Sequence, residues 1–376
     1  MLFRSASDAP DLDAAPDAAT GWNIRSTCAP FTTSRVTLGD DGQSLLVLAD
    51  FDGDTRLDAI RTRAWTTARH WGPGRIELYP GLGNGSFSAP VSFEAGGIPI
   101  NAAAGDFDGD GLDDLAVKVS IAGDHARLLL FRGDARDGLQ QPVAYYDPSP
   151  YLGNDLVAQD MDGDGFDDLI VSRQTPEQRI DVLFGGSLPF RSIASSGSLS
   201  GEVSGVALAD LDGDGDKDAI AATVSGWDVL INDGHGSLAR IFHANADMVG
   251  NGTPSALDVD RDGTEELVVL RHDETSATVR VNAYRYVPRA RAFAHKQLFE
   301  APWLTELVVG DVDDDGREDV ALLTGEQTEL LLLDADGLRH AAIPSTTGQL
   351  ALGDVTGDGL TDLVFGTTWG MEVFPR

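Results

Sequence analysis

Short apolar segments separated by glycine- and aspartate-rich turns run along almost the whole chain. After the acidic turns come runs of mainly β-branched or apolar residues, such as DLAV at 114–117, DLIV at 168–171 and DVAL at 319–322. Apolar runs of this kind with turn signals at both ends are typical of strands buried on both faces. Nothing in the pattern resembles a long amphipathic helix. The pattern therefore predicts an all-β protein.

Each buried run belongs to a larger unit of four expected strands. A short apolar segment precedes the acidic turn, and in five units it ends in or near a small residue, which suits a crowded axis: Ala49, Gly105, Ala209, Gly310 and Gly353. A third strand, as in RIELYPG and RLLLFRG, runs into Gly/Asn/Asp turn chemistry. A weaker fourth strand, such as PVSFE or PVAYY, completes the unit.

The acidic turn recurs seven times, and its starting positions differ by 56, 54, 50, 48, 53 and 43 residues. The copies begin at Asp50, Asp106, Asp160, Asp210, Asp258, Asp311 and Asp354. Periods of this length are typical of propeller blades and solenoid repeats. Seven units of four antiparallel strands predict a seven-bladed β-propeller, with an open solenoid as the alternative.

The two ends of the chain favour the propeller. The last unit stops at MEVFPR, its third strand, while segment 28–39, CAPFTTSRVTLG, precedes the first unit and has strand-like composition. We expect this N-terminal strand to close the ring, so that residues 28–376 form a single propeller; a solenoid would need polar caps instead. Residues 1–27 include an Asp/Ala/Pro run without apolar periodicity, which predicts a flexible tether.

Charge narrows the range of partners. The chain has 376 residues, 42% of them hydrophobic, with 27 Lys and Arg against 61 Asp and Glu, a net charge of -34. This balance argues against nucleic acid and anionic membranes as partners, and it favours bound cations. No apolar stretch is long enough for a transmembrane segment, and the start lacks the apolar centre of a signal peptide. Cys28 is the only cysteine, which excludes an internal disulfide and a cysteine metal cluster.

The acidic turns themselves require a cation. DFDGDGLDD at 106–114 holds five carboxylates in nine residues, and two like charges about 4 Å apart repel by roughly 4 kcal/mol at an effective dielectric near 20. We expect carboxylates at positions 1, 3, 5 and 9 and the backbone carbonyl of position 7 to converge on one ion. Glycine at position 6 in six copies supplies the positive φ of such a turn.

An all-oxygen ligand set fits Ca²⁺ better than Mg²⁺, zinc or copper. An EF-hand would need a Glu at position 12 and flanking helices, and solvated turns without metal are a poor explanation for seven copies in register. The sequence therefore predicts up to seven structural calcium ions. The expected ligands are Asp50, Asp52, Asp54, Arg56, Asp58, Asp106, Asp108, Asp110, Leu112, Asp114, Asp160, Asp162, Asp164, Phe166, Asp168, Asp210, Asp212, Asp214, Asp216, Asp218, Asp258, Asp260, Asp262, Thr264, Glu266, Asp311, Asp313, Asp315, Arg317, Asp319, Asp354, Thr356, Asp358, Leu360 and Asp362.

Two copies depart from the pattern. Thr55 replaces glycine at position 6 of the first loop, and Thr356 replaces the aspartate at position 3 of the seventh. Calcium occupancy is least expected in these two loops.

The D-x-D-x-D-G-x-x-D loops resemble the FG-GAP repeat, also called the VCBS-type repeat, of integrin α propellers and of many secreted or surface bacterial proteins. The resemblance extends from about Cys28 to Arg376. It implies that the loops join the first and second strands of each blade, at the face opposite the usual ligand surface. It also implies an exported protein, extracellular or on the cell surface.

A ligand site is predicted at the open face, where blades 1, 6 and 7 are neighbours in a closed ring. Aromatic platforms with nearby cations could hold a sugar or an anionic group, although packing between blades also explains any one of these tryptophans. The candidates are Arg61, Arg63, Trp65, Arg69, His70, Trp71, Trp303 and Trp369. The tripeptide RGD at 132–134 is better explained by turn chemistry.

No catalytic constellation stands out, because the seven histidines are scattered and lack metal-ligand spacing. We therefore predict a calcium-stabilised extracellular binding or adhesion module, expected to be monomeric, that presents a rigid propeller face to carbohydrate or protein. The alternative is a calcium-dependent propeller enzyme, a lyase or hydrolase, acting on polysaccharide. The fold alone does not decide between them, since propellers serve both roles.

Overall fold

The computed structural model describes much of the chain from residue 34 onwards. The described residues are 34–37, 45–63, 66–67, 70–71, 74–121, 125–145, 152–174, 178–190, 192–246, 254–260, 262–273, 278–302, 304, 306–324, 327–334, 337–344, 349–367 and 370–376. The predicted tether, residues 1–27, lies outside them.

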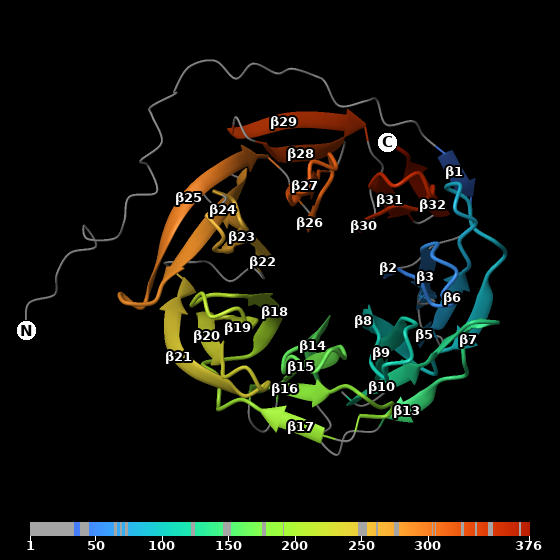
Figure 1. The fold of residues 1–376 in the computed structure, drawn as a ribbon, viewed down its shortest axis with the longest axis horizontal. Coiled ribbons are helices and arrows are strands. Elements are labelled where there is room, and N and C mark those ends of the chain that lie inside the picture. Colours follow the sequence, from blue (N-terminus) through green and yellow to red (C-terminus); the bar gives the residue numbers. More distant parts are fainter. Residues whose placement is uncertain are drawn as a thin grey trace, which may run out of the picture.

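Seven four-stranded antiparallel sheets stand around a central axis like the blades of a wheel (Figure 1). This arrangement confirms the predicted seven-bladed β-propeller. From the inner to the outer strand, blade 1 consists of β2 (Leu46–Ala49), β3 (Asp58–Arg63), β6 (Arg75–Tyr79) and β7 (Val91–Glu94). Blade 2 consists of β8 (Ile98–Gly105), β9 (Asp114–Ile121), β10 (His125–Phe131) and β13 (Val143–Tyr145). Blade 3 consists of β14 (Leu152–Gln159), β15 (Asp168–Arg173), β16 (Arg179–Phe184) and β17 (Ser192–Ser195).

The remaining blades follow the same order. Blade 4 consists of β18 (Val203–Ala209), β19 (Asp218–Thr223), β20 (Gly226–Asn232) and β21 (Leu238–Asn245). Blade 5 consists of β22 (Ser255–Leu257), β23 (Glu266–Asp273), β24 (Thr278–Val287) and β25 (Ala292–Ala301). Blade 6 consists of β26 (Glu306–Gly310), β27 (Asp319–Leu323), β28 (Gln327–Asp334) and β29 (Gly337–Pro344). Blade 7 consists of β30 (Gln349–Gly353), β31 (Asp362–Thr367), β32 (Gly370–Phe374) and β1 (Ser34–Thr37).

The outer strand of blade 7 comes from the other end of the chain. Strand β1 pairs antiparallel with β32 over four residue pairs, from Ser34 opposite Val373 to Thr37 opposite Gly370. In Figure 1 the blue β1 lies beside the red β32. The predicted closure of the ring by segment 28–39 is therefore confirmed, and β1 is the part of that segment that forms the strand.

The hydrophobic core lies between blades. Buried residues of β3 and β6 in blade 1 pack against those of β9 and β10 in blade 2, and similar clusters fill the other junctions, including that between blades 7 and 1. The second residue of each acidic turn inserts into the junction with the following blade, as Phe51 and Phe107 do in the first two. The acidic turns are thus anchored by an apolar side chain.

The small residues at the ends of the inner strands are explained by the neighbouring blade. A Cβ atom added to Gly105 would lie 2.6 Å from the Asp167 carboxylate of blade 3, and one on Gly353 would lie 2.5 Å from Leu57 of blade 1. At these two positions the crowding comes from the loop of the next blade. At Gly310 it comes from Leu352 on the neighbouring inner strand, 2.7 Å from an added Cβ atom.

Two short ribbons interrupt the repeat. Strands β4 (Thr66–Thr67) and β5 (His70–Trp71) pair with each other in the connection between the second and third strands of blade 1. Strands β11 (Gly133–Asp134) and β12 (Gly138–Leu139) form a similar ribbon after β10. Neither ribbon was expected from the apolar pattern.

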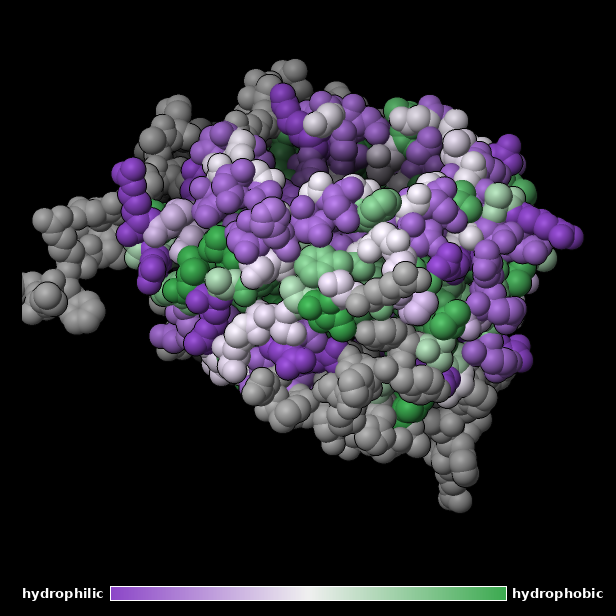
Figure 2. All heavy atoms as spheres, turned by 60° about the horizontal axis from the view of Figure 1, so that its bottom comes forward, coloured by the Kyte–Doolittle hydropathy of each residue, from purple (hydrophilic) through white to green (hydrophobic). Residues whose placement is uncertain are grey.

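The surface is polar on one face and mixed at the rim. Figure 2, in which the lower part of Figure 1 comes forward, shows a largely hydrophilic upper face and hydrophobic patches along the rim. Val143 on β13 and Ile193 on β17 are among the exposed apolar side chains of the outer strands. Within the described residues, the model has no helix of the length and hydropathy that a membrane span requires.

Candidate metal centres

The seven acidic turns, here called loops 1 to 7 after their blades, all have the same place in the blade. Position 1 follows the inner strand directly, and position 9 is the first residue of the second strand, as Asp106 and Asp114 are in blade 2. This placement agrees with the connection implied by the FG-GAP resemblance. Because every loop joins the same two strands, all seven emerge at the same end of the wheel.

The carboxylate at position 1 organises the turn. In loop 2, Asp106 Oδ1 accepts hydrogen bonds from the backbone N–H of Gly109 and Asp110 at 2.8 and 3.2 Å, and Asp106 Oδ2 accepts one from Gly111 at 2.9 Å. Loop 1 repeats the three bonds around Asp50. The chain therefore wraps around the first carboxylate.

Positive φ angles make this wrapping possible. At position 6 the glycines have φ between 83° and 97°, and Thr55 in loop 1 keeps the same left-handed conformation at φ 69°. This confirms the expected role of the position-6 glycines. A β-branched residue in that region is strained, so loop 1 adopts the common turn at an energetic cost.

The carboxylate at position 9 joins three strands. Asp114 Oδ2 accepts the N–H of Phe107 at 3.0 Å, and Asp114 Oδ1 accepts the N–H of Gly133, just after β10, at 2.9 Å. Asp58, Asp168 and Asp218 make the equivalent pair of bonds. Position 9 was expected only as a metal ligand. This pair of backbone hydrogen bonds, here called the clamp, was not expected.

Burial makes the position-9 carboxylates unusual acids. Asp114 and Asp218 are completely buried, and desolvation raises the pKa of each to about 7. The same cause raises the pKa of Asp58, Asp168 and Asp319 to about 6. Neighbouring aspartates at positions 3 and 5 add to the shift of Asp114. The charged form of these carboxylates is therefore unfavourable without a nearby cation.

Carboxylates converge in loops 1 to 5. In loops 1 to 4 the side chains of positions 1, 3 and 9 each offer an oxygen within 4.8 Å of the others, for example Asp210, Asp212 and Asp218 in loop 4. In loop 5 the converging group is Asp258, Asp260 and Asp262, positions 1, 3 and 5. Position 5 of loops 1 to 4 lies outside these groups, and its role as a ligand stays a prediction. There its Oδ1 accepts the N–H of position 7, as Asp110 does from Leu112 at 3.0 Å.

The residues fit a divalent cation with oxygen ligands. Asp108, position 3 of loop 2, has a side chain that is only 6% exposed, and neither carboxylate oxygen has a hydrogen-bond partner. Its single ionic neighbour is Arg132, whose Nη1 lies 2.6 Å from Asp108 Oδ2. Oδ1 remains without a partner beside Asp106 and Asp114. Oxygen-only ligands of this kind are those preferred by Ca²⁺.

Position 7 has a second contact beyond the turn. A Cβ atom added to Gly53 in loop 1 would lie 2.5 Å from the Leu112 side chain, and one on Gly109 in loop 2 would lie 2.1 Å from that of Phe166. Each of these position-7 side chains therefore covers the loop of the preceding blade. At these two positions the side chain therefore has a packing role in addition to the ligand role expected of the backbone carbonyl.

Position 8 connects loops directly. The Asp113 carboxylate of loop 2 accepts the N–H of Asp50 at 2.9 Å, while its own N–H donates to the Asp50 carbonyl at 3.2 Å. Asp167 and Asp106 repeat this exchange between loops 3 and 2. The backbone of each of these metal-ligand candidates is thus held by the next blade.

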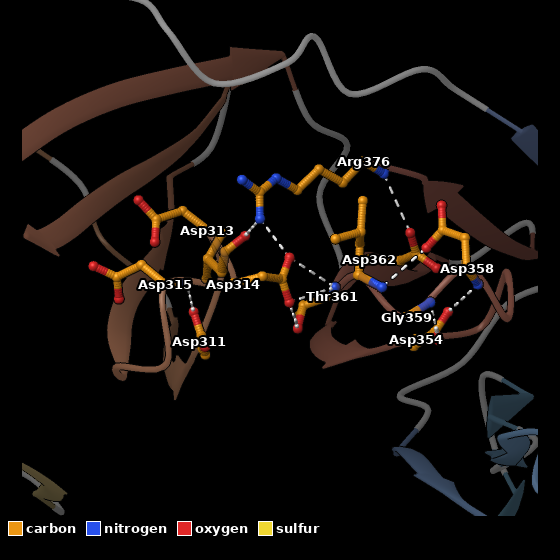
Figure 3. Close-up of polar contacts among 12 residues, drawn as sticks. Asp311, Asp313, Asp314, Asp315, Asp354, Asp358, Gly359, Thr361, Asp362 and Arg376 are labelled. Atoms are coloured by element: carbon orange, nitrogen blue, oxygen red, sulfur yellow. Dashed lines mark hydrogen bonds and ion pairs between the residues drawn. The ribbon is translucent and has the colours of Figure 1, made fainter.

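Loops 6 and 7 are joined differently (Figure 3). Thr361 donates to Asp314 through both its N–H and its hydroxyl, and the guanidinium of Arg376 forms an ion pair with the same carboxylate. The N–H of Arg376 also donates to Asp362 at 3.2 Å. In loop 7, Thr356 donates its hydroxyl to Asp354 at 3.4 Å. The lower calcium occupancy expected of this loop stays a prediction.

The predicted ligand-binding residues are described only in part. Trp65, Arg69, Trp303 and Trp369 lie outside the described residues, and only the backbone of Arg63, His70 and Trp71 is described. Arg61 is 1% exposed and lies opposite Glu77 in the register of β3 and β6, so its side chain is inside blade 1 and not at a surface. The ligand site at the open face stays a prediction for the other seven residues.

The RGD tripeptide is used within the fold. Arg132 pairs with Asp108, the N–H of Gly133 binds Asp114, and Asp134 accepts the N–H groups of Arg136 and Asp137 at 3.0 Å. The expected turn role is confirmed.

Comparison with known proteins agrees with this geometry. The model of the FG-GAP-like repeat matches residues 50–117 and 160–221. No curated protein matches the chain in sequence.

Similar solved structures share the fold at low identity. BBS1N, solved in complex with ARL6DN, is 13% identical with a TM-score of 0.58, covering 92% of this chain and 97% of that one. An Agrocybe aegerita lectin with specific recognition of non-reducing terminal N-acetylglucosamine is 15% identical with a TM-score of 0.57, covering 88% and 87%. The BP39L lectin from Burkholderia pseudomallei is 11% identical with a TM-score of 0.57, covering 89% and 98%. These likenesses concern the fold: the chain is a seven-bladed β-propeller that contains FG-GAP-like repeats.

Proposed function

We propose that this protein is an extracellular or cell-surface binding module whose propeller is stabilised by structural calcium. The observation that carries the proposal is the convergence of carboxylates at positions 1, 3 and 9 in loops 1 to 4, with position 9 buried in each. A divalent ion there would neutralise carboxylates that burial otherwise disfavours. The ligand oxygens belong to one loop each, so we assign the ion a structural role.

The ligand is proposed to be carbohydrate or protein, bound at a face of the wheel. The similar structures include two lectins and a protein solved in complex with another protein, and a rigid ring of blades can present loops to either kind of partner. A polysaccharide-degrading enzyme is the competing function, and the propeller fold is compatible with both.

Thermal unfolding with calcium, magnesium or chelator tests the metal. Each site adds about 2.7 kcal/mol when free calcium is about 100-fold above its Kd, so calcium should raise the melting temperature strongly and magnesium should raise it less. A melting temperature that does not move between chelator and millimolar calcium would contradict the proposal.

A glycan array and a polysaccharide-degradation screen, each with and without calcium, test the ligand. We expect binding without release of product. For the predicted site, Trp71→Ala and Trp369→Ala should weaken binding while the melting temperature stays the same. Release of product would favour the enzyme, and unchanged binding by both variants would exclude that sector.

A further inference from the structure

An arginine lies among the ligand carboxylates of loop 5. Arg285 on β24 is only 17% exposed, and its Nη2 lies 2.6 Å from Asp260 while its Nη1 lies 3.0 Å from Asp262. The same guanidinium contacts Glu266, to which Nε donates at 2.6 Å. One side chain therefore bridges positions 3, 5 and 9, three of the four carboxylates expected to bind an ion.

The strand register places this guanidinium in the loop. Leu267 on β23 lies opposite Tyr284 on β24, so Glu266 and Arg285 are the next opposing pair towards the loop. In blades with aspartate at position 9, the corresponding oxygen accepts a backbone N–H after the third strand, as Asp218 does from Asn232 at 2.8 Å. In blade 5 the Arg285 side chain makes this bond instead. Glutamate is one methylene longer than aspartate, which gives the guanidinium room beside the loop.

Blade 2 shows that an arginine at this register need not fill the loop. Arg132 lies opposite Asp114 in the same way, next to the pair of Leu115 and Phe131. It contacts only Asp108 among the loop carboxylates, and its other terminal nitrogen donates to the Leu188 carbonyl of blade 3. Asp114 keeps both backbone hydrogen bonds. The carboxylates of positions 1, 3 and 9 therefore still converge in loop 2, whereas position 9 is missing from the converging group of loop 5.

We propose that Arg285 is the resident cation of loop 5 and excludes calcium from it, so that this blade is stabilised without metal. The inference rests on the proposed calcium loading of the other loops. A guanidinium is always charged and presents its donors in a fixed plane that matches carboxylates. A calcium ion would need the same oxygens and would be repelled by the arginine unless that side chain left its partners.

Counting bound calcium tests the assignment. The chain would be dialysed against calcium and its metal content measured by elemental analysis and native mass spectrometry, for wild type, Arg285→Met and the control Arg280→Met. Arg280 lies on the same strand and pairs with Glu300, 3.1 Å away. Arg285→Met should bind one more calcium ion per chain than wild type and the control. In chelator this variant should melt below wild type, and calcium should remove the difference.

A pair of substitutions in the loops keeps the test open if Arg285→Met does not fold. Asp212→Asn and Asp260→Asn each neutralise position 3, in loops 4 and 5 respectively. We expect Asp212→Asn to lose one calcium ion and Asp260→Asn to lose none. An equal, non-zero calcium content in wild type and Arg285→Met, or loss of an ion in Asp260→Asn, would overturn the assignment alone. Absence of calcium from every chain would overturn the proposed function together with it.

Discussion

Blades 4 and 7 are the same four-stranded sheet made in two ways. Blade 4 is one continuous stretch of chain from β18 to β21, whereas blade 7 takes β30 to β32 from one end and β1 from the other. In both, a half-buried carboxylate of the preceding blade binds the inner strand: Asp155 accepts the N–H of Val206, and Glu306 accepts that of Leu350. Blade 7 also has contacts made by the chain end itself, because Arg376 reaches Asp362 and Asp314. Where the backbone does not continue, side chains and a distant strand hold the sheet.

Of the changes that test this comparison, removal of β1 should destabilise the protein most. A chain without residues 1–37 loses the four residue pairs with β32, which costs about 4 kcal/mol at roughly 1 kcal/mol per backbone hydrogen bond. It also exposes an unpaired edge strand that invites association. Denaturant unfolding and light scattering after gel filtration measure both. The control lacks residues 1–27 only and should match the full chain; an equal loss in both chains would contradict the predicted boundary.

The next largest effect is expected from removal of the carboxylate at position 9, and it should differ between blades 4 and 7. Asp218→Ala leaves the N–H groups of Leu211 and Asn232 without partners inside the protein, and unfolding in chelator should become easier by about 3 kcal/mol. Asp362→Ala should cost less, about 2 kcal/mol, because one of its partners is the N–H of Arg376, a partly exposed residue that water can reach, whereas Asn232 is buried. Asp214→Ala, at the exposed position 5, is the control and should change little. Equal losses in blades 4 and 7 would show that chain continuity is irrelevant.

Neutralising the two carboxylates that bind the inner strands should have opposite effects on stability. Burial raises the pKa of Glu306 from its usual 4.5 to about 7, and the N–H of Leu350 only partly opposes this shift. Since the folded protein binds this proton more tightly, stability falls as pH rises from about 4.5 through about 7. Glu306→Gln keeps an acceptor for Leu350 and should gain about 2 kcal/mol at pH 8 and little at pH 5.

Asp155 has a compensating charge. Burial raises its pKa, but nearby Lys118, itself 1% exposed, opposes the shift. Asp155→Asn should therefore destabilise the protein by about 2 kcal/mol at neutral pH, because it leaves Lys118 buried without a counter-ion. Denaturant unfolding between pH 5 and pH 8 measures both variants. A gain in both at pH 8 would mean that Lys118 does not stabilise Asp155.

The smallest effect is expected at the other side of the blade 7 junction, in loop 1. Thr55 has φ 69° where the other loops have glycine, and Thr55→Gly should stabilise the protein by about 1 kcal/mol by removing that strain. Thr55→Ala keeps a Cβ in the left-handed region and should gain much less. If alanine and glycine stabilise equally, the cost lies in the threonine side chain and not in the backbone.

The repeat made most of the fold predictable. Each blade repeats one pattern of apolar runs and turns, and the missing fourth strand after MEVFPR led to the closure by the segment that contains β1. The turn geometry was also predictable, because glycine at position 6 has a direct conformational meaning. These features depend on residues close in sequence, or on counting strands.

The contacts between strands and between blades were not predictable. Arg285 lies 19 residues after Glu266, and only the register of β23 and β24 shows that the two side chains meet. The burial of Arg61 likewise depends on its pairing with Glu77 across two strands. Asp113 holds a loop 63 residues earlier in the chain, although an acidic residue at position 8 looks like one more ligand in the sequence.

The pairing of β1 with β32 has a consequence for biosynthesis. Ser34 is synthesised long before Val373, yet they are partners in the finished sheet. On the ribosome, β1 must therefore stay unpaired until β32 has emerged. Contacts of such long sequence separation form slowly. The pairing of β1 with β32 therefore determines when a newly made propeller becomes resistant to proteases and to unwanted strand pairing.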